Sequence, residues 1–146
     1  MSNYRLIQLT NNNIPAVAVD TNMPLGTITR RVACNRCEPT FVVSSSSVDT
    51  ITINEEGYYK VAYNGALVAT DAGVVELTLV VNGVNTYVVG ETAVAGATVN
   101  VTLDYVVRVF KRCDDIATNN PMTIQVESTG VALTSGTSNI IVERVY

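Results

Sequence analysis

The chain has 146 residues, 47% of them hydrophobic and 15% charged, with a formal net charge of −4. This length suits one domain, and the hydrophobic fraction is enough to build a core without metal ions or disulfides. The low content of basic residues gives little attraction for phosphate backbones, so we expect no nucleic-acid partner.

The first 24 residues are expected to form an extended N-terminal arm ahead of a domain at 25–146. Asn11, Asn12 and Asn13, together with Pro15 and Pro24, interrupt regular strand pairing in this part of the chain. The segment lacks the apolar core of a secretory signal, and no later stretch has the length of a membrane helix, so we expect a soluble product of the cytoplasm with no membrane partner. The side chains expected to anchor the arm on a partner surface are Tyr4, Leu6, Ile7, Leu9, Ile14 and Val17.

The rest of the chain is predicted to consist of short strands separated by Gly, Asn, Asp and Ser turns. The Asn82-Gly83 pair is the clearest hairpin turn, because a two-residue type I′ loop needs positive φ at both positions. So many short strands without a helical pattern indicate a sandwich of antiparallel sheets. The predicted strands are Thr27 to Val32, Thr40 to Val43, Asp49 to Asn54, Tyr58 to Thr70, Val74 to Val81, Val84 to Val89, Thr98 to Lys111, Met122 to Ser128 and Asn139 to Tyr146.

Two of these strands have informative faces. After the turn at Gly57, alternation places Tyr59, Val61 and Tyr63 on one face, which offers an aromatic stripe to a core or to a partner. In the segment 98–111, one face is continuously apolar and is predicted to be core. The other face is polar at first and becomes apolar near Val106 and Phe110, which suggests that a neighbouring subunit covers that end.

Candidate chemical sites are few. The chain has no histidine, which removes the commonest acid, base and nucleophile arrangements, so we expect no enzyme, no catalytic residue and no cofactor. The adjacent carboxylates Glu55 and Glu56 are interpreted as a solvated turn. Two further groups are interpreted as ordinary turns rather than zinc or calcium sites: Cys34 and Cys37 with the distant Cys113, and the loop residues Asp114, Asp115, Asn119 and Asn120.

The Gly57-Tyr58-Tyr59-Lys60-Val61-Ala62-Tyr63 stretch, after an Ile51-Thr52-Ile53 strand, resembles the C strand of tumour-necrosis-factor and C1q-like jelly rolls. The resemblance implies an all-β antiparallel jelly-roll sandwich that forms a homotrimer. It favours Tyr63 and Tyr105 at the trimer interface, with Tyr146 at the chain end. The large aromatic surface of the predicted sheet adds Tyr59 and Phe110 to this interface.

The C-terminal segments Met122 to Glu127 and Asn139 to Tyr146 resemble the trimeric jelly rolls of bacteriophage virions and bacterial spore coats. This resemblance implies a structural virion protein of a bacteriophage, made in the host cytoplasm. It would be a capsid-decorating or head-fibre trimer whose partners are its own copies and capsid or fibre-base proteins. The alternatives are a receptor-binding or glycan-binding tip, or a spore-surface jelly roll. The predicted loops carry few aromatic rings for a glycan site, which favours a structural role.

Overall fold

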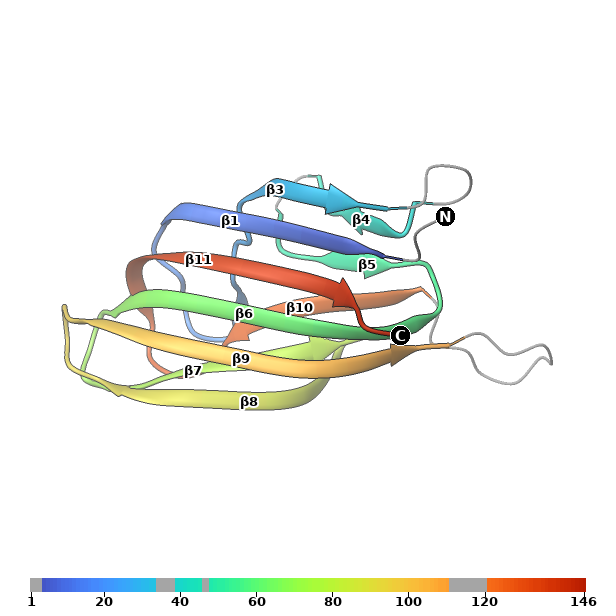
Figure 1. Cartoon of the computed structure of the whole chain (residues 1–146). Coiled ribbons are helices and arrows are strands. Elements are labelled where there is room, and N and C mark those ends of the chain that lie inside the picture. Colours follow the sequence, from blue (N-terminus) through green and yellow to red (C-terminus); the bar gives the residue numbers. More distant parts are fainter. Residues whose placement is uncertain (1–3, 34–38, 46–47, 111–120) are drawn as a thin grey trace.

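The computed structural model describes residues 4–33, 39–45, 48–110 and 121–146, and within these ranges all regular structure is β-strand. The strands form two antiparallel sheets that face each other, so the predicted jelly-roll sandwich is confirmed (Figure 1). No helix capable of crossing a membrane occurs in these ranges.

The five-stranded sheet has the order β3-β1-β11-β6-β9. The other sheet has the order β4-β5-β10-β7-β8, and the short β2 pairs with β10. The strands of the first sheet are β3 (Thr27–Val32), β1 (Leu6–Ile14), β11 (Leu133–Arg144), β6 (Gly57–Ala69) and β9 (Thr98–Val109). Those of the second are β4 (Phe41–Val43), β5 (Ile51–Ile53), β10 (Met122–Ser128), β7 (Gly73–Val81), β8 (Val84–Ala93) and β2 (Thr21–Asn22).

The alternation predicted for β6 and β9 is present. Tyr59, Val61 and Tyr63 point into the sandwich and are fully buried, whereas Tyr58 and Lys60 on the same strand are exposed. Along β9 the apolar face is directed at the core, while its other face is exposed. Because side chains of a strand alternate between faces, the period-two pattern was sufficient to identify the buried set.

The predicted hairpin turn between β7 and β8 is confirmed. Asn82 has φ of 50° and Gly83 has φ of 77°, so both central residues adopt the left-handed conformation of a type I′ turn. Asn82 is further held by its own side chain, whose Oδ1 accepts a hydrogen bond of 2.8 Å from the amide of Thr123. This turn thereby sets the register of β7 against β8.

The prediction of an arm separate from the domain is wrong for most of the segment 1–24. Strand β1 lies inside the five-stranded sheet, between β3 and β11 (Figure 1). The asparagine run is accommodated by a register shift between Asn11 and Ile14, so it bends the strand without ending it. The apolar side chains expected to seek a partner are buried in this chain itself: Leu6, Ile7, Leu9, Ile14 and Val17.

Several strand boundaries differ from expectation by one or two residues, and two differ by more. Strand β11 begins at Leu133, six residues before the predicted start, because Leu133 is buried against the core and the strand pairs with β6 from there. Strand β8 extends to Ala93 along β7. The cysteine turn at 34–38 lies outside the described residues, as do Cys113 and the acidic loop at 114–120.

Candidate functional site

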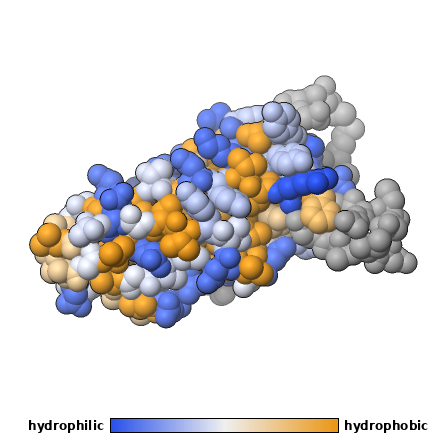
Figure 2. All heavy atoms as spheres, turned by 90° about the horizontal axis from the view of Figure 1, so that it is seen from below, coloured by the Kyte–Doolittle hydropathy of each residue, from blue (hydrophilic) through white to orange (hydrophobic). Residues whose placement is uncertain are grey.

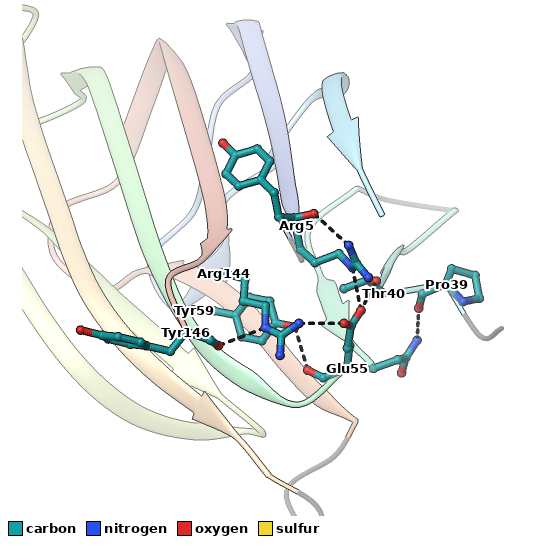
Figure 3. A network of polar contacts seen from close by, with 9 residues as sticks. Arg5, Pro39, Thr40, Glu55, Tyr59, Arg144 and Tyr146 are labelled. Atoms are coloured by element: carbon teal, nitrogen blue, oxygen red, sulfur yellow. Dashed lines mark hydrogen bonds and ion pairs between the residues drawn. The ribbon is translucent and has the colours of Figure 1, made fainter. Parts of the chain in front are cut away.

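A network of charged and polar side chains centres on Glu55, in the turn between β5 and β6 (Figure 3). Its Oε2 accepts hydrogen bonds from Arg5 Nε at 2.9 Å and from Thr40 Oγ1 at 2.7 Å. Its Oε1 accepts one from Arg144 Nη1 at 2.9 Å. The hydroxyl of Tyr59 donates to the main-chain oxygen of Glu55 at 2.8 Å. The network therefore joins the start of β1, the end of β11 and the β5–β6 turn.

The electrostatics of this network favour an ionised Glu55. Partial burial alone would raise the pKa of the carboxyl group. The hydrogen bonds from Thr40 and Arg5, with the charges of Arg5 and Arg144, outweigh burial and hold the pKa below its ordinary value. Burial, with the nearby Glu55 charge, raises the pKa of Tyr59 to about 12, so this hydroxyl remains a donor at neutral pH.

Both oxygens of Glu55 are engaged, so the arrangement acts as a structural clamp and does not present a general base to solvent. No group of three or more metal-ligating side chains occurs in the described part of the chain. The interpretation of Glu55 as a solvated turn residue is wrong, because two arginines bind its carboxylate. These arginines lie 50 and 89 positions away in the sequence, so no local pattern indicates the pairing.

A second feature lies at the same end of the five-stranded sheet, on its outer face. We call it the aromatic-arginine cluster: Tyr58, Arg108, Phe110 and Tyr146. The guanidinium carbon of Arg108 is 5.6 Å from the ring centroid of Tyr58 and 5.4 Å from that of Phe110. The Tyr58 and Tyr146 rings meet edge to face, with centroids 5.9 Å apart. An open groove of about 310 Å³ runs between these side chains.

The cluster is held by the chain end. The amide of Tyr58 donates to the main-chain oxygen of Tyr146 at 3.1 Å, and the amide of Val145 donates to the oxygen of Tyr58 at 2.7 Å. Even so, 82% of Tyr146 and 41% of Tyr58 remain exposed. Exposed tyrosine rings beside a guanidinium give this surface the composition that is typical of protein interfaces.

A third feature, the valine-tyrosine edge, follows the end strands of the two sheets. Strands β8 and β9 contact each other along one side of the sandwich. Tyr87 of β8 stacks on Tyr105 of β9, with centroids 5.2 Å apart and planes inclined by 27°. Figure 2 views the molecule from this side and shows apolar patches among polar ones. The edge comprises Val84, Tyr87, Val88, Tyr105 and Val106.

The residues predicted for a trimer interface are thus divided by the structure. Tyr59 and Tyr63 are fully buried in the core of one chain, so their assignment to an interface is wrong. Tyr105 lies at the valine-tyrosine edge, while Phe110 and Tyr146 lie in the aromatic-arginine cluster, and for these three the interface stays a prediction. Tyr58 was not among the predicted interface residues, although the alternation of β6 placed it on the face opposite the core.

Of the residues predicted to anchor an arm, only Tyr4 is exposed. Its hydroxyl donates to Glu143 Oε2 at 2.7 Å, which ties it to the neighbouring strand β11. The hydrogen bond to Glu143 raises the pKa of the Tyr4 hydroxyl, because deprotonation would break this bond and place the phenolate beside the Glu143 carboxylate. An anchoring role for the buried members of that set would require the domain to open.

No protein-family model matches this chain, and no characterised protein matches its sequence. Similar solved structures exist. The globular domain of zebrafish complement 1qA has a TM-score of 0.69 at 9% identity, covering 97% of this chain and 98% of that one. Eiger TNF from S. frugiperda has a TM-score of 0.69 at 7% identity, covering 98% and 92%.

The PRD1 vertex protein P5 is also similar, with a TM-score of 0.55 at 14% identity over 97% of both chains. At such low identity the likeness concerns the fold. The chain has the jelly-roll fold shared by tumour-necrosis-factor and C1q-like proteins, so the fold expected from the Gly57 to Tyr63 stretch is confirmed.

Proposed function

We propose that this chain is a non-enzymatic structural protein of a bacteriophage virion, which assembles as a homotrimer and decorates a capsid or forms part of a head fibre. The observation that carries the assembly is the exposed aromatic-arginine cluster at one end of the five-stranded sheet. The valine-tyrosine edge supplies further exposed apolar area, with 52% of Val106 and 51% of Val88 accessible. Clusters of this kind on a folded domain are characteristic of association surfaces.

The position of the two features suits contact between copies of the chain. Arg108 of the cluster and Val106 of the edge lie on the same exposed face of β9. A copy that covers the end of β9 would therefore bury a tyrosine, an arginine and a valine together. Because each copy has both surfaces, a head-to-tail contact that closes after three copies leaves none of them exposed.

The virion assignment rests on the resemblance of the C-terminal strands and on the fold. The PRD1 vertex protein P5 has this fold, and a vertex is a position that a decorating or fibre protein would occupy. C1q and TNF proteins have the same fold. The fold therefore supports a module that associates with its own copies, and the virion role is a more specific proposal.

Sedimentation equilibrium of the purified chain tests the assembly. We expect three times the chain mass of 15.6 kDa at micromolar concentration. The variant Arg108→Glu should dissociate it, because a carboxylate cannot replace the guanidinium between the two rings. Val42→Glu is the control: Val42 is also exposed, at 43%, but lies on β4, at the opposite edge of the sandwich from β9. A monodisperse monomer would overturn the assembly.

A separate measurement tests whether the chain is a component of the virion. Mass spectrometry of purified particles from the source should detect the chain at a fixed ratio to the major shell protein. Antibody labelling viewed by electron microscopy should place it on the particle surface. A trimer that is absent from particles would retain the assembly and reject the virion role.

A further inference from the structure

The described part of the chain contains two Asn-Gly pairs in contrasting environments. Asn82-Gly83 forms the exposed turn between β7 and β8, whereas Asn64-Gly65 lies within β6, between β11 and β9. We propose that Asn82 is a site of spontaneous deamidation, at which Gly83 closes a succinimide ring, and that the fold protects Asn64 from the same reaction. This inference does not depend on the proposed function.

The reaction needs only the two turn residues and water. The main-chain nitrogen of Gly83 forms a bond to Cγ of Asn82, the bond from Cγ to Nδ2 breaks, and ammonia leaves with the proton of the Gly83 amide. Water then opens the ring. Hydrolysis at the Cγ carbonyl gives aspartate, and hydrolysis at the main-chain carbonyl gives isoaspartate. Glycine favours ring closure because it has no Cβ to obstruct the approach of its nitrogen.

The reacting side chain of Asn82 is anchored to β10. Its Oδ1 accepts hydrogen bonds from the amide of Thr123 at 2.8 Å and from the Thr123 hydroxyl at 3.4 Å. The amide of Asn82 donates to the main-chain oxygen of Thr123 at 3.0 Å. Negative charge develops on Oδ1 when a nitrogen attacks Cγ. Donors already directed at this oxygen therefore stabilise the intermediate in the manner of an oxyanion hole.

The attacking group, by contrast, has room to move. The amide of Gly83 donates no hydrogen bond to any described residue, and an added Cβ at Gly83 would meet no atom within 4 Å. Rotation about the Cα–C bond of Asn82 carries the Gly83 nitrogen towards Cγ while the side chain stays bound to Thr123. This rotation opens only the turn, and the exposed end of a hairpin opens more readily than the centre of a sheet.

Asn64 has the same following residue without this freedom. Gly65 is buried and pairs with Ser138 of β11 on one side and with Val101 of β9 on the other. A residue of a central strand directs its amide at one of its two neighbouring strands. The nitrogen of Gly65 therefore approaches Cγ of Asn64 only when the sheet opens, which requires unfolding of the core.

Deamidation at Asn82 should weaken the hairpin. Isoaspartate adds one methylene group to the backbone of a two-residue turn in which Val81 pairs with Val84. Loop length sets the register of a hairpin, so the longer backbone strains the pairing of β8 with β7. Aspartate at the same position adds a negative charge and leaves the backbone length unchanged.

Peptide mapping by mass spectrometry during incubation in mildly alkaline buffer tests the site. Both asparagines are followed in the same sample, so Asn64 is an internal control. In the folded protein we expect Asn82 to deamidate about tenfold faster than Asn64 or more. In concentrated guanidinium chloride the two rates should become similar. A rate at Asn82 no greater than that at Asn64 in the folded protein would overturn the inference. The same ratio in denaturant would overturn the protective role of the fold.

A second measurement tests the effect on the hairpin. Fragmentation by electron transfer identifies isoaspartate, and anion exchange separates the deamidated chains from unreacted ones. Their thermal unfolding is compared with that of Asn82→Asp, which carries the charge alone. We expect a lower Tm for the deamidated chains than for Asn82→Asp. Equal Tm values would contradict the predicted strain between β7 and β8.

Discussion

Arg144 and Glu55 are joined by an ion pair of 2.9 Å that ties the last strand of the chain to the turn before β6. The same carboxylate binds Arg5, which precedes the first strand. One acidic side chain thus joins the start of β1 to the end of β11 at one end of the five-stranded sheet, next to the surface proposed for assembly. The side chains are 14–29% exposed, so these pairs are less screened by solvent than ordinary surface pairs.

Replacing this carboxylate should destabilise the domain. For Glu55→Gln we expect a loss of about 1–3 kcal/mol in the free energy of unfolding, since two guanidinium groups lose a charged acceptor. Urea denaturation measures the change. Glu56→Gln is the matched control on the neighbouring position, and we expect it to stay within about 0.5 kcal/mol. Equal effects of the two substitutions would contradict a specific role of Glu55.

The same network predicts a pH dependence. The pKa of Glu55 is below its ordinary value of 4.5 in the folded protein, so unfolding at acidic pH takes up a proton. The stabilisation is fully present above the unfolded pKa and is lost as pH falls through the folded pKa. Unfolding free energies at pH 6 and pH 3 should therefore differ more for the wild type than for Glu55→Gln. Parallel curves would show that other carboxylates dominate.

Gly57 at the start of β6 should tolerate no side chain. Its φ is 150°, and an added Cβ would lie 2.6 Å from Arg144 Nε and 2.7 Å from the main-chain oxygen of Tyr146. Gly57→Ala and Gly57→Val should each cost about 1 kcal/mol or more, measured by thermal unfolding. Gly96→Ala is the control that separates backbone strain from crowding. Gly96 also has positive φ, but an added Cβ there would meet no atom within 4 Å. An effect of Gly57→Ala no greater than that of Gly96→Ala would show that crowding is unimportant.

Removal of residues 1–24 should abolish folding, since it removes β1 from between β3 and β11. Leu9→Ala, at a fully buried position of that strand, should cost about 2–5 kcal/mol. Tyr4→Phe removes an exposed hydroxyl group and serves as the control, with an expected change below about 0.5 kcal/mol. Circular dichroism and urea denaturation measure both. A truncated chain with intact β structure would restore the interpretation of an independent arm.

The sequence by itself determined the elements whose information is local. The period-two patterns of β6 and β9 identified the buried faces, because a strand places alternate side chains on opposite sides. Asn82 and Gly83 identified a turn, because both residues accept positive φ. Together with the Gly57 to Tyr63 stretch, these patterns were sufficient to predict the fold class.

Only the tertiary structure decided where the β1 segment, the tyrosines and Glu55 belong. An apolar stripe in the sequence predicts that these side chains will be buried. It does not indicate whether the same chain or another chain buries them. Tyr59 and Tyr63 are covered by the opposite sheet, whereas Tyr146 remains exposed. Strand β1 pairs with β11, more than a hundred residues later, and that pairing becomes favourable only when the other strands are in place.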